Sequence, residues 1–310
     1  MITVLSGGTG SLKLVQGLLK IIKPEEVTIV VNTADDFEWL GLYISPDLDT
    51  SIYLLAGLLD ENRFWGIKGD TFHFLSMIKS YGYEDWFSVG DRDLATHFHR
   101  TMLIKKGYTL TETAASLCHA FNIRVKILPM SNEKVSTFVK TDKGTFPFQE
   151  FWVKRKGKDK VSGVHFEGMK EAKPAPGVIE SITKADGIII GPSNPVTSIG
   201  PILSLPGIRK ALENVGARRI CISPIVGREP ISGPAGNLLR GIGVEVSSFG
   251  VASIYQGLID DIFIDNCDEA LDGRIRTLGV NVFFTNIVMR NEEDKLNLAR
   301  RIIERLGAEK

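Results

Sequence analysis

The pattern of apolar positions at the start of the chain predicts a strand, a tight turn and a helix. Residues 2–5 read ITVL and are apolar except for Thr3. Residues 6–11 read SGGTGS, and apolar residues then return at helical spacing from Leu12 to Leu19. Buried-strand patterns recur at 27–31, 125–128, 188–190, 220–223, 262–265 and 280–284. Helical patterns lie at 109–121, 207–212 and 292–306. This alternation predicts an α/β fold with a mostly parallel sheet.

The alternation is interrupted in the middle of the chain. Alternating or aromatic-rich runs at 135–139, 146–153 and 164–166, separated by turn residues, predict an antiparallel excursion. We therefore expect residues 61–169 to form a smaller inserted helical and β-hairpin region. The core would consist of residues 1–60 and 170–310.

Charge and cysteine usage narrow the class of protein. Lys plus Arg and Asp plus Glu each number 37, so general attraction to nucleic acid or to an anionic membrane is not expected. Cys118, Cys221 and Cys267 are far apart and lack metal-ligand spacing, which suggests reduced, mostly buried thiols. No apolar run approaches the ~20 residues that span a bilayer, and no export signal is recognisable. We expect a soluble globular protein of the cytoplasm.

The glycine turn has the features of a phosphate-binding site. Gly7, Gly8 and Gly10 let the backbone approach a ligand, Thr9 adds a hydroxyl, and the following helix would direct its N–H groups at an anion. The turn matches neither the dinucleotide fingerprint nor the P-loop, and Lys13 lies too late for a P-loop lysine. A turn that only packs the helix on the strand is the alternative.

Carboxylates follow in two clusters. Asp35 and Asp36 come directly after the strand at 27–31, and Asp47 and Asp49 lie in the stretch SPDLDTS. If the first crossover is right-handed, the first pair lies beside the glycine turn. Carboxylates at such an edge could hold Mg²⁺ bridged to phosphate oxygens. The structural alternative is that Asp35 makes a turn and Asp49 or Thr50 caps a helix.

Two later segments carry further candidates. Ser193, Asn194 and Pro195 lie in a second small-residue turn after the strand at 188–190, and Arg228 lies in a loop where its guanidinium could neutralise phosphate. In residues 86–101 we expect a helix that begins at Asp91 or Asp93.

In this helix, Leu94, Phe98 and Met102 are expected on one face. Asp93, His97 and Arg100 are near one another at steps of four and three, and Asp93 with His97 is expected to be a surface pair. Arg92, in a polar stretch beside aromatic residues, suits contact with a flat polar ligand.

Several motifs together resemble the 2-phospho-L-lactate transferase family. They are GGTG at 7–10, NTADD at 32–36, SPDLDT at 45–50, GDRDLATH at 90–97 and GPSNP at 191–195. The resemblance spans essentially the whole chain. It implies a Rossmann-like fold with helices on both faces of the sheet. It also implies Mg²⁺-dependent transfer of a phospholactyl group from lactyl-2-diphospho-5'-guanosine to Fo, 8-hydroxy-5-deazariboflavin, which forms coenzyme F(420)-0 and GMP.

The resemblance also implies roles for the candidate residues. The nucleotide would contact the two small-residue turns and Arg228, that is Gly7, Gly8, Thr9, Gly10, Ser193, Asn194, Pro195 and Arg228. Asp36 and Asp49 would hold Mg²⁺ and orient or deprotonate the acceptor alcohol. Fo would contact Asp49, Ser88, Asp91, Arg92 and His97. A homodimer is expected.

Other readings stay open at this point. Relatives in bacteria and plants are thought to use a phosphoenolpyruvyl donor, and no motif selects guanine over another base. A related branch, the gluconeogenesis-factor proteins, resembles a nucleotide-sugar-binding regulator without transferase activity. The segment 86–101 matches the transferase branch instead. An NAD(P)-dependent oxidoreductase is disfavoured, because its fingerprint and ribose-binding acid are missing.

Overall fold

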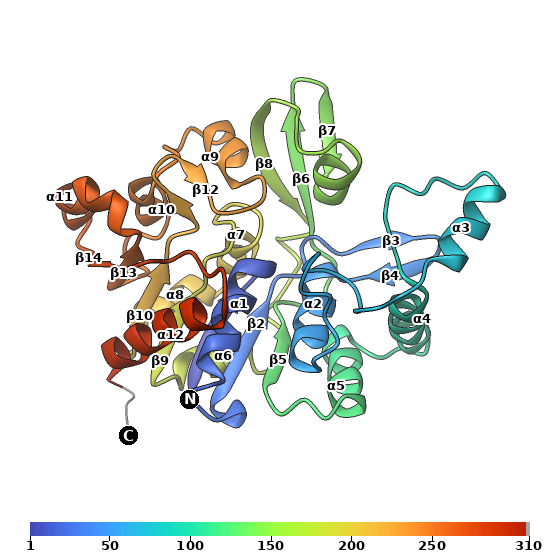
Figure 1. Cartoon of the computed structure of the whole chain (residues 1–310), viewed down its shortest axis with the longest axis horizontal. Coiled ribbons are helices and arrows are strands. Elements are labelled where there is room, and N and C mark those ends of the chain that lie inside the picture. Colours follow the sequence, from blue (N-terminus) through green and yellow to red (C-terminus); the bar gives the residue numbers. More distant parts are fainter. Residues whose placement is uncertain (308–310) are drawn as a thin grey trace.

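A seven-stranded parallel sheet forms the centre of the molecule in the computed structural model, which describes residues 1–307 (Figure 1). The strand order is β14-β13-β10-β9-β1-β2-β5. Its strands are β1 (Ile2–Ser6), β2 (Val27–Val31), β5 (Lys126–Pro129), β9 (Gly187–Ile190), β10 (Arg218–Ile222), β13 (Asp261–Ile264) and β14 (Asn281–Phe284). Every neighbouring pair is parallel, as the apolar pattern predicts.

The strand order reverses next to β1. The chain adds β2 and then β5 on one side of β1, and later adds β9, β10, β13 and β14 on the other side. The loops that follow β1 and β9 therefore leave the sheet in opposite directions and open a crevice at the carboxyl ends of these two strands. Ligands of open α/β sheets bind at such a switch point.

Helices cover both faces of the sheet because residues of the strands alternate between them. Val4 packs in one apolar cluster, and its neighbour Leu5 packs in the other. The face of Val4 is covered by α1 (Thr9–Leu18), α2 (Pro46–Leu55), α5 (Leu110–Ala120) and α12 (Glu292–Leu306). The face of Leu5 is covered by α6 (Val178–Thr183), α7 (Ile199–Ser204), α8 (Ile208–Asn214), α9 (Ala235–Gly241), α10 (Ser248–Ile254) and α11 (Asp272–Arg276).

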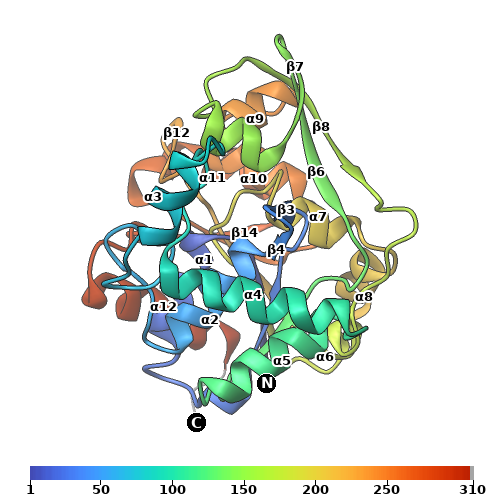
Figure 2. The same cartoon turned by 90° about the vertical axis from the view of Figure 1, so that its right-hand side faces the viewer.

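Two smaller units project from the core (Figures 1 and 2). One consists of the hairpin β3 (Phe37–Trp39) and β4 (Leu42–Ile44) with α3 (His73–Ser80) and α4 (Asp91–Lys105). The other is an antiparallel sheet of β6 (Ser136–Thr141), β7 (Gly144–Pro147) and β8 (Val161–Glu167). This second sheet lies at the end of the molecule opposite to the described chain ends (Figure 1).

Two details differ from the sequence-based picture. The expected strand at 146–153 ends at Pro147, and Glu150–Lys154 form a π-helical turn that buries Phe151 in the core and leaves Trp152 partly exposed. Strand β5 lies within residues 61–169, the span assigned to an inserted region, yet it pairs with β2 in the central sheet. Among residues 1–307, no helix is both long and apolar enough to cross a membrane.

Candidate functional site

The two small-residue turns contact each other at the switch point. The N–H of Gly7 donates to Ser193 Oγ at 3.3 Å, and the hydroxyls of Ser11 and Ser193 are 2.5 Å apart. A Cβ at Gly10 would lie 2.2 Å from the carbonyl oxygen of Pro192, so only glycine allows this approach. The turns predicted separately after β1 and β9 therefore form one structure.

A cavity of about 720 Å³ opens beside these turns. Of the residues selected from the sequence, its lining includes Gly7, Gly8, Thr9, Gly10, Asp49, Ser88, His97, Ser193 and Asn194. Aromatic side chains complete the wall, namely Phe64, Trp65, Phe87, Phe148 and Trp152. The cavity thus joins the core with loops of both projecting units, and its size suits a small organic ligand.

Five selected residues lie outside this lining: Asp36, Asp91, Arg92, Pro195 and Arg228. The carboxylate of Asp91 accepts from the hydroxyl of Thr71 and from the N–H groups of His73 and Phe74, and so stabilises the start of α3. Arg92 and Arg228 are exposed. The structure therefore brings together the residues expected at the nucleotide turns but not this outer group.

Asp36 is buried away from the cavity. Its carboxylate accepts hydrogen bonds from Ser45 Oγ at 2.8 Å and from Tyr43 OH at 3.0 Å. Burial raises its pKa, an effect that these hydrogen bonds and the charge of Arg100 oppose. These contacts tie the loop after β2 to β4 and to the start of α2.

Asp35 and Asp47 share one amide partner at the cavity. Asn32 Nδ2 donates to Asp35 Oδ2 and to Asp47 Oδ2, both at 3.0 Å. Burial raises the pKa of Asp47 to about 6, and burial together with the charge of Asp47 raises the pKa of Asp35. Neither carboxylate forms an ion pair with a cationic side chain of residues 1–307, so their negative charge is not compensated there.

The negative charge of Asp49 is compensated by the guanidinium of Arg100. The guanidinium is completely buried; its Nη1 donates to Asp49 Oδ2 at 3.1 Å and to the carbonyl of Tyr43 at 3.3 Å, and its Nη2 donates to Asp49 Oδ1. The expectation that Asp49 caps a helix is wrong, since α2 begins at Pro46 after Ser45. Asp49 lies inside the helix, where it faces Arg100 and the cavity.

Helix α4 buries its polar side. Asp93, Thr96, His97, Arg100 and Thr101 are buried, whereas Phe98 and Met102 are 58% and 39% exposed. Of the expected apolar face, Leu94 packs against a small apolar cluster that includes Ile44 and Val89, whereas Phe98 and Met102 point outward. The reason lies in the partner surface, because α4 packs where α2 and β4 present carboxylate, phenol and backbone groups that require polar partners.

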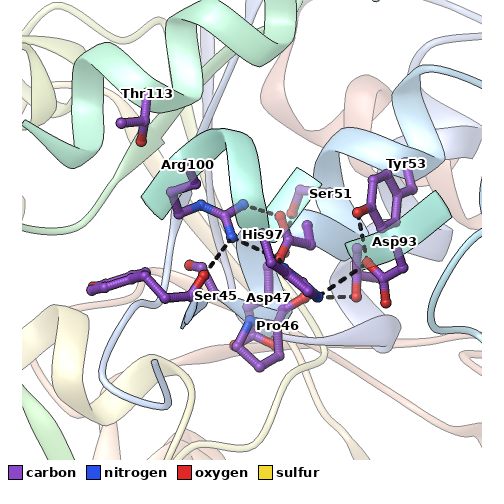
Figure 3. A network of polar contacts seen from close by, with 12 residues as sticks. Ser45, Pro46, Asp47, Ser51, Tyr53, Asp93, His97, Arg100 and Thr113 are labelled. Atoms are coloured by element: carbon purple, nitrogen blue, oxygen red, sulfur yellow. Dashed lines mark hydrogen bonds and ion pairs between the residues drawn. The ribbon is translucent and has the colours of Figure 1, made fainter. Parts of the chain in front are cut away.

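His97 lies between two carboxylates (Figure 3). Its Nδ1 is 3.4 Å from Asp49 Oδ2, and its Nε2 is 3.3 Å from Asp93 Oδ1. Tyr53 OH donates to the same oxygen of Asp93 at 2.7 Å. Burial alone would raise the pKa of Asp93, but its contacts with His97, Tyr53 and Arg100 lower it. The expected surface pair of Asp93 and His97 is wrong, because His97 is only 2% exposed.

Asp36 and Asp49, the pair expected to hold Mg²⁺, have other partners in the structure. The carboxylate of Asp36 accepts from Ser45 Oγ, and that of Asp49 accepts from Arg100. Asp35 Oδ1 is buried without a hydrogen-bond partner among the described residues, and both Asp35 and Asp47 line the cavity. Residues 1–307 contain no group of three or more potential metal ligands. Two carboxylates completed by substrate phosphates and water are a donor set that Mg²⁺ accepts.

Four residues at or beside the cavity are missing from the expected site residues, namely Asp35, Asp47, Arg100 and Lys13. The sequence marks Asp35 and Asp47 only as members of the acidic clusters that could hold Mg²⁺, Arg100 only by its helical spacing, and Lys13 as too late for a P-loop lysine. All but Arg100 line the cavity. A usable signal was Asn32 at the end of a buried strand, since an amide next to acidic residues predicts a shared hydrogen-bond network.

Comparison with known proteins identifies the family and the fold. The family described as 2-phospho-L-lactate transferase CofD matches residues 2–288. The 2-phospho-L-lactate transferases of Methanosarcina mazei and Methanocaldococcus jannaschii are 43% and 41% identical to the chain; the matches cover 97% and 99% of it and 99% of each relative. A crystal structure of a UPF0052 family member from Bacillus halodurans has the same fold, with a TM-score of 0.66 and 18% identity over 97% of this chain and 98% of that one.

Proposed function

We propose that this chain, which belongs to the 2-phospho-L-lactate transferase CofD family, transfers a 2-phospholactyl group from lactyl-2-diphospho-5'-guanosine to the ribityl hydroxyl of Fo. The products are coenzyme F(420)-0 and GMP. The observation that carries the proposal is the cavity at the switch point, which joins the two turns to a cluster of carboxylates. The transferase names of the relatives support the same reaction class.

The two small-residue turns supply hydrogen-bond donors that would bind the nucleotide-linked lactyl substrate. Backbone N–H groups near Gly8 and at the start of α1 suit a diphosphate, and the hydroxyls of Thr9 and Ser193 add further donors. Asn194 Nδ2 and Thr197 Oγ1 are buried at the cavity without hydrogen-bond partners among the described residues. Such groups gain free energy when a polar ligand reaches them.

Asp49 and the aromatic wall suit the acceptor. Flat rings such as that of Fo pack favourably on Trp65 and Phe87, and Ser88 lies next to them in the lining. Arg100 keeps the Asp49 carboxylate in a fixed orientation at the cavity. Asp49 then accepts the hydrogen bond of the ribityl hydroxyl.

In the proposed step, the ribityl oxygen attacks the phosphorus that carries the lactyl group. The bond from this phosphorus to the bridging oxygen breaks, and the oxygen leaves with the electron pair as part of GMP. The hydroxyl proton passes to Asp49. Donors at the turns stabilise the charge on the phosphoryl oxygens.

Mg²⁺ is part of this proposal. Asp35 and Asp47 would hold the ion, because both face the cavity and neither has a cationic partner among the described residues. When bound, the ion would neutralise phosphate charge. Removal of Mg²⁺ with a chelator should abolish turnover, and added Mg²⁺ should restore it.

The test is the mass of Fo after incubation with the protein, Mg²⁺ and lactyl-2-diphospho-5'-guanosine, beside a reaction with the phosphoenolpyruvyl donor. A phospholactyl adduct with released GMP is expected. An enolpyruvyl adduct alone would reassign the donor, and no adduct from either would contradict the transferase. The regulatory alternative, which the relatives' names do not favour, would then be tested by titration with UDP-sugars.

A cytoplasmic homodimer is proposed as the form in which the enzyme works. The exposed Phe98 and Met102 on α4 support an interface with a second copy, because large apolar side chains seldom gather on a free surface. Light scattering of the native protein and of Phe98→Ser tests this. A monomeric native protein would contradict it.

A further inference from the structure

Lys13 lies on α1, three residues beyond the glycine turn, and its side chain lines the same cavity. We propose that the Lys13 ammonium binds the diphosphate of the donor and neutralises the negative charge that develops on the departing nucleotide. This role rests on the proposed transferase function and assigns to that reaction a further catalytic residue.

The first argument is the uncompensated charge of Lys13. Within residues 1–307, no carboxylate lies within 4.0 Å of its Nζ; the ammonium is placed 4.6 Å from the ring centroid of Phe64. Burial and the nearby charge of Lys295 lower the pKa of Lys13. A half-buried cation in such surroundings favours the arrival of an anion.

The neighbouring Lys295 differs from Lys13 because it has carboxylate partners. This neighbouring lysine is 5% exposed, but its Nζ lies 2.5 Å from Glu292 Oε1 and 4.0 Å from Glu61 Oε2. Lys295 thus has local carboxylates, whereas Lys13 faces the cavity. Of the two lysines, only Lys13 has its charge available to a ligand there.

The second argument is the charge balance of the cavity. Its lining contains four aspartates, at positions 35, 47, 49 and 93, and only two long cationic side chains, Lys13 and Arg63. Arg63 is paired with Asp60 and stacks on Trp65. A diphosphate that enters an acidic cavity needs positive charge, and Lys13 is the cavity cation that no carboxylate of the described chain neutralises.

The third argument is chemical. When the bond between the lactyl-bearing phosphorus and the bridging oxygen breaks, its electron pair stays on that oxygen, and the charge of the GMP phosphate grows. A compact ammonium in the cavity that the glycine turn lines would offset this charge without taking part in the proton transfer to Asp49. Its contribution should be larger in the transition state than in the bound ground state.

The test compares Lys13→Met and Lys13→Arg with Lys23→Met. Lys23 is exposed just beyond α1, so its variant removes one positive charge outside the cavity. Steady-state kinetics would give kcat and KM for the donor and for Fo, and calorimetry would give the Kd of GDP. Circular dichroism and thermal melting would establish that each variant is folded.

For Lys13→Met we expect kcat/KM for the donor to fall about a hundredfold, as for loss of one group that stabilises an oxyanion, with a weaker GDP affinity. KM for Fo should stay within about twofold, Tm should not fall, and Lys13→Arg should recover part of the GDP affinity. Lys23→Met should match the native protein.

Native kcat/KM and native GDP affinity in a folded Lys13→Met variant would overturn the role of Lys13 and leave the transferase intact. An equal loss of kcat/KM and GDP affinity in Lys23→Met would mean that only the total charge of the protein matters, and it would overturn a direct contact of Lys13 with the diphosphate. Failure of the native protein both to bind GDP and to form product would instead overturn the proposed function, and the role of Lys13 with it.

Discussion

Asp47 and Asp49 are separated by one residue in the first turn of α2, yet only Asp49 is paired with a cationic side chain. Asp49 is held by the buried guanidinium of Arg100, whereas Asp47 accepts from the amide of Asn32 and from the backbone N–H of Gly8. The charge of Asp49 is therefore compensated inside the protein, and that of Asp47 is not. Substitution of the two residues should change stability in opposite directions.

Asp47→Asn should stabilise the protein at neutral pH and abolish turnover. The pKa of Asp47 is raised to about 6 from 3.8, so the native state binds its proton more readily than the unfolded chain does. The unfavourable charge is absent below pH 4, grows between pH 4 and 6, and is complete above pH 6. The asparagine should raise the free energy of unfolding by about 1–3 kcal/mol at pH 7.

Denaturant unfolding at pH 4 and pH 7, in chelator, measures this effect. The gain should nearly disappear at pH 4, where native Asp47 is protonated and the residue in the unfolded chain is only about half ionised. Added Mg²⁺ should stabilise the native protein more than Asp47→Asn. A loss of stability at pH 7 would show that the charge of Asp47 is compensated after all.

Asp49→Asn should destabilise the protein. It leaves the fully buried Arg100 without its counter-charge, which costs about 3–5 kcal/mol in comparable buried pairs. Arg100→Gln should cost a similar amount. The double variant should be less destabilised than the sum of the two, and urea unfolding of all four proteins measures the coupling. Strictly additive losses would mean that the pair is not coupled.

Gly10→Ala should separate the two turns. The added Cβ would lie 2.2 Å from the carbonyl oxygen of Pro192, so the turn after β9 must move. We expect a loss of about 1–3 kcal/mol in stability, as for other overpacked sites, and a loss of GDP affinity. Gly216→Ala is the matched control, since nothing lies within 4 Å of its Cβ. Unchanged GDP binding in Gly10→Ala would contradict the proposed phosphate site.

Thr101→Val tests the polar inner side of α4. Thr101 Oγ1 accepts from the N–H of Tyr43 at 2.8 Å and donates to the carbonyl of His97 at 2.7 Å. The valine leaves the N–H of Tyr43 without its partner, which should cost about 1–3 kcal/mol. Thr145→Val, at an exposed position of β7, should change stability by less than about 0.5 kcal/mol. Equal effects of the two substitutions would contradict the observation that α4 buries its polar side.

The parallel sheet, the two small-residue turns and the acidic edge can be predicted from the amino-acid sequence alone. These features follow from local rules: apolar runs such as 27–31 must be buried, glycines permit close backbone approach, and the carboxyl ends of parallel strands meet at one edge. The family resemblance followed from the same motifs, and the family match confirms it.

The partner of each carboxylate depends on how distant parts of the chain pack together, which the sequence does not reveal. Asp47 and Asp49 look alike in the sequence, but Arg100 arrives from α4, 51 residues away, and reaches only Asp49. The burial of His97 and the exposure of Phe98 likewise depend on what α4 packs against. Helical spacing shows which residues share a face, but the polarity of the surface opposite that face decides which side is buried.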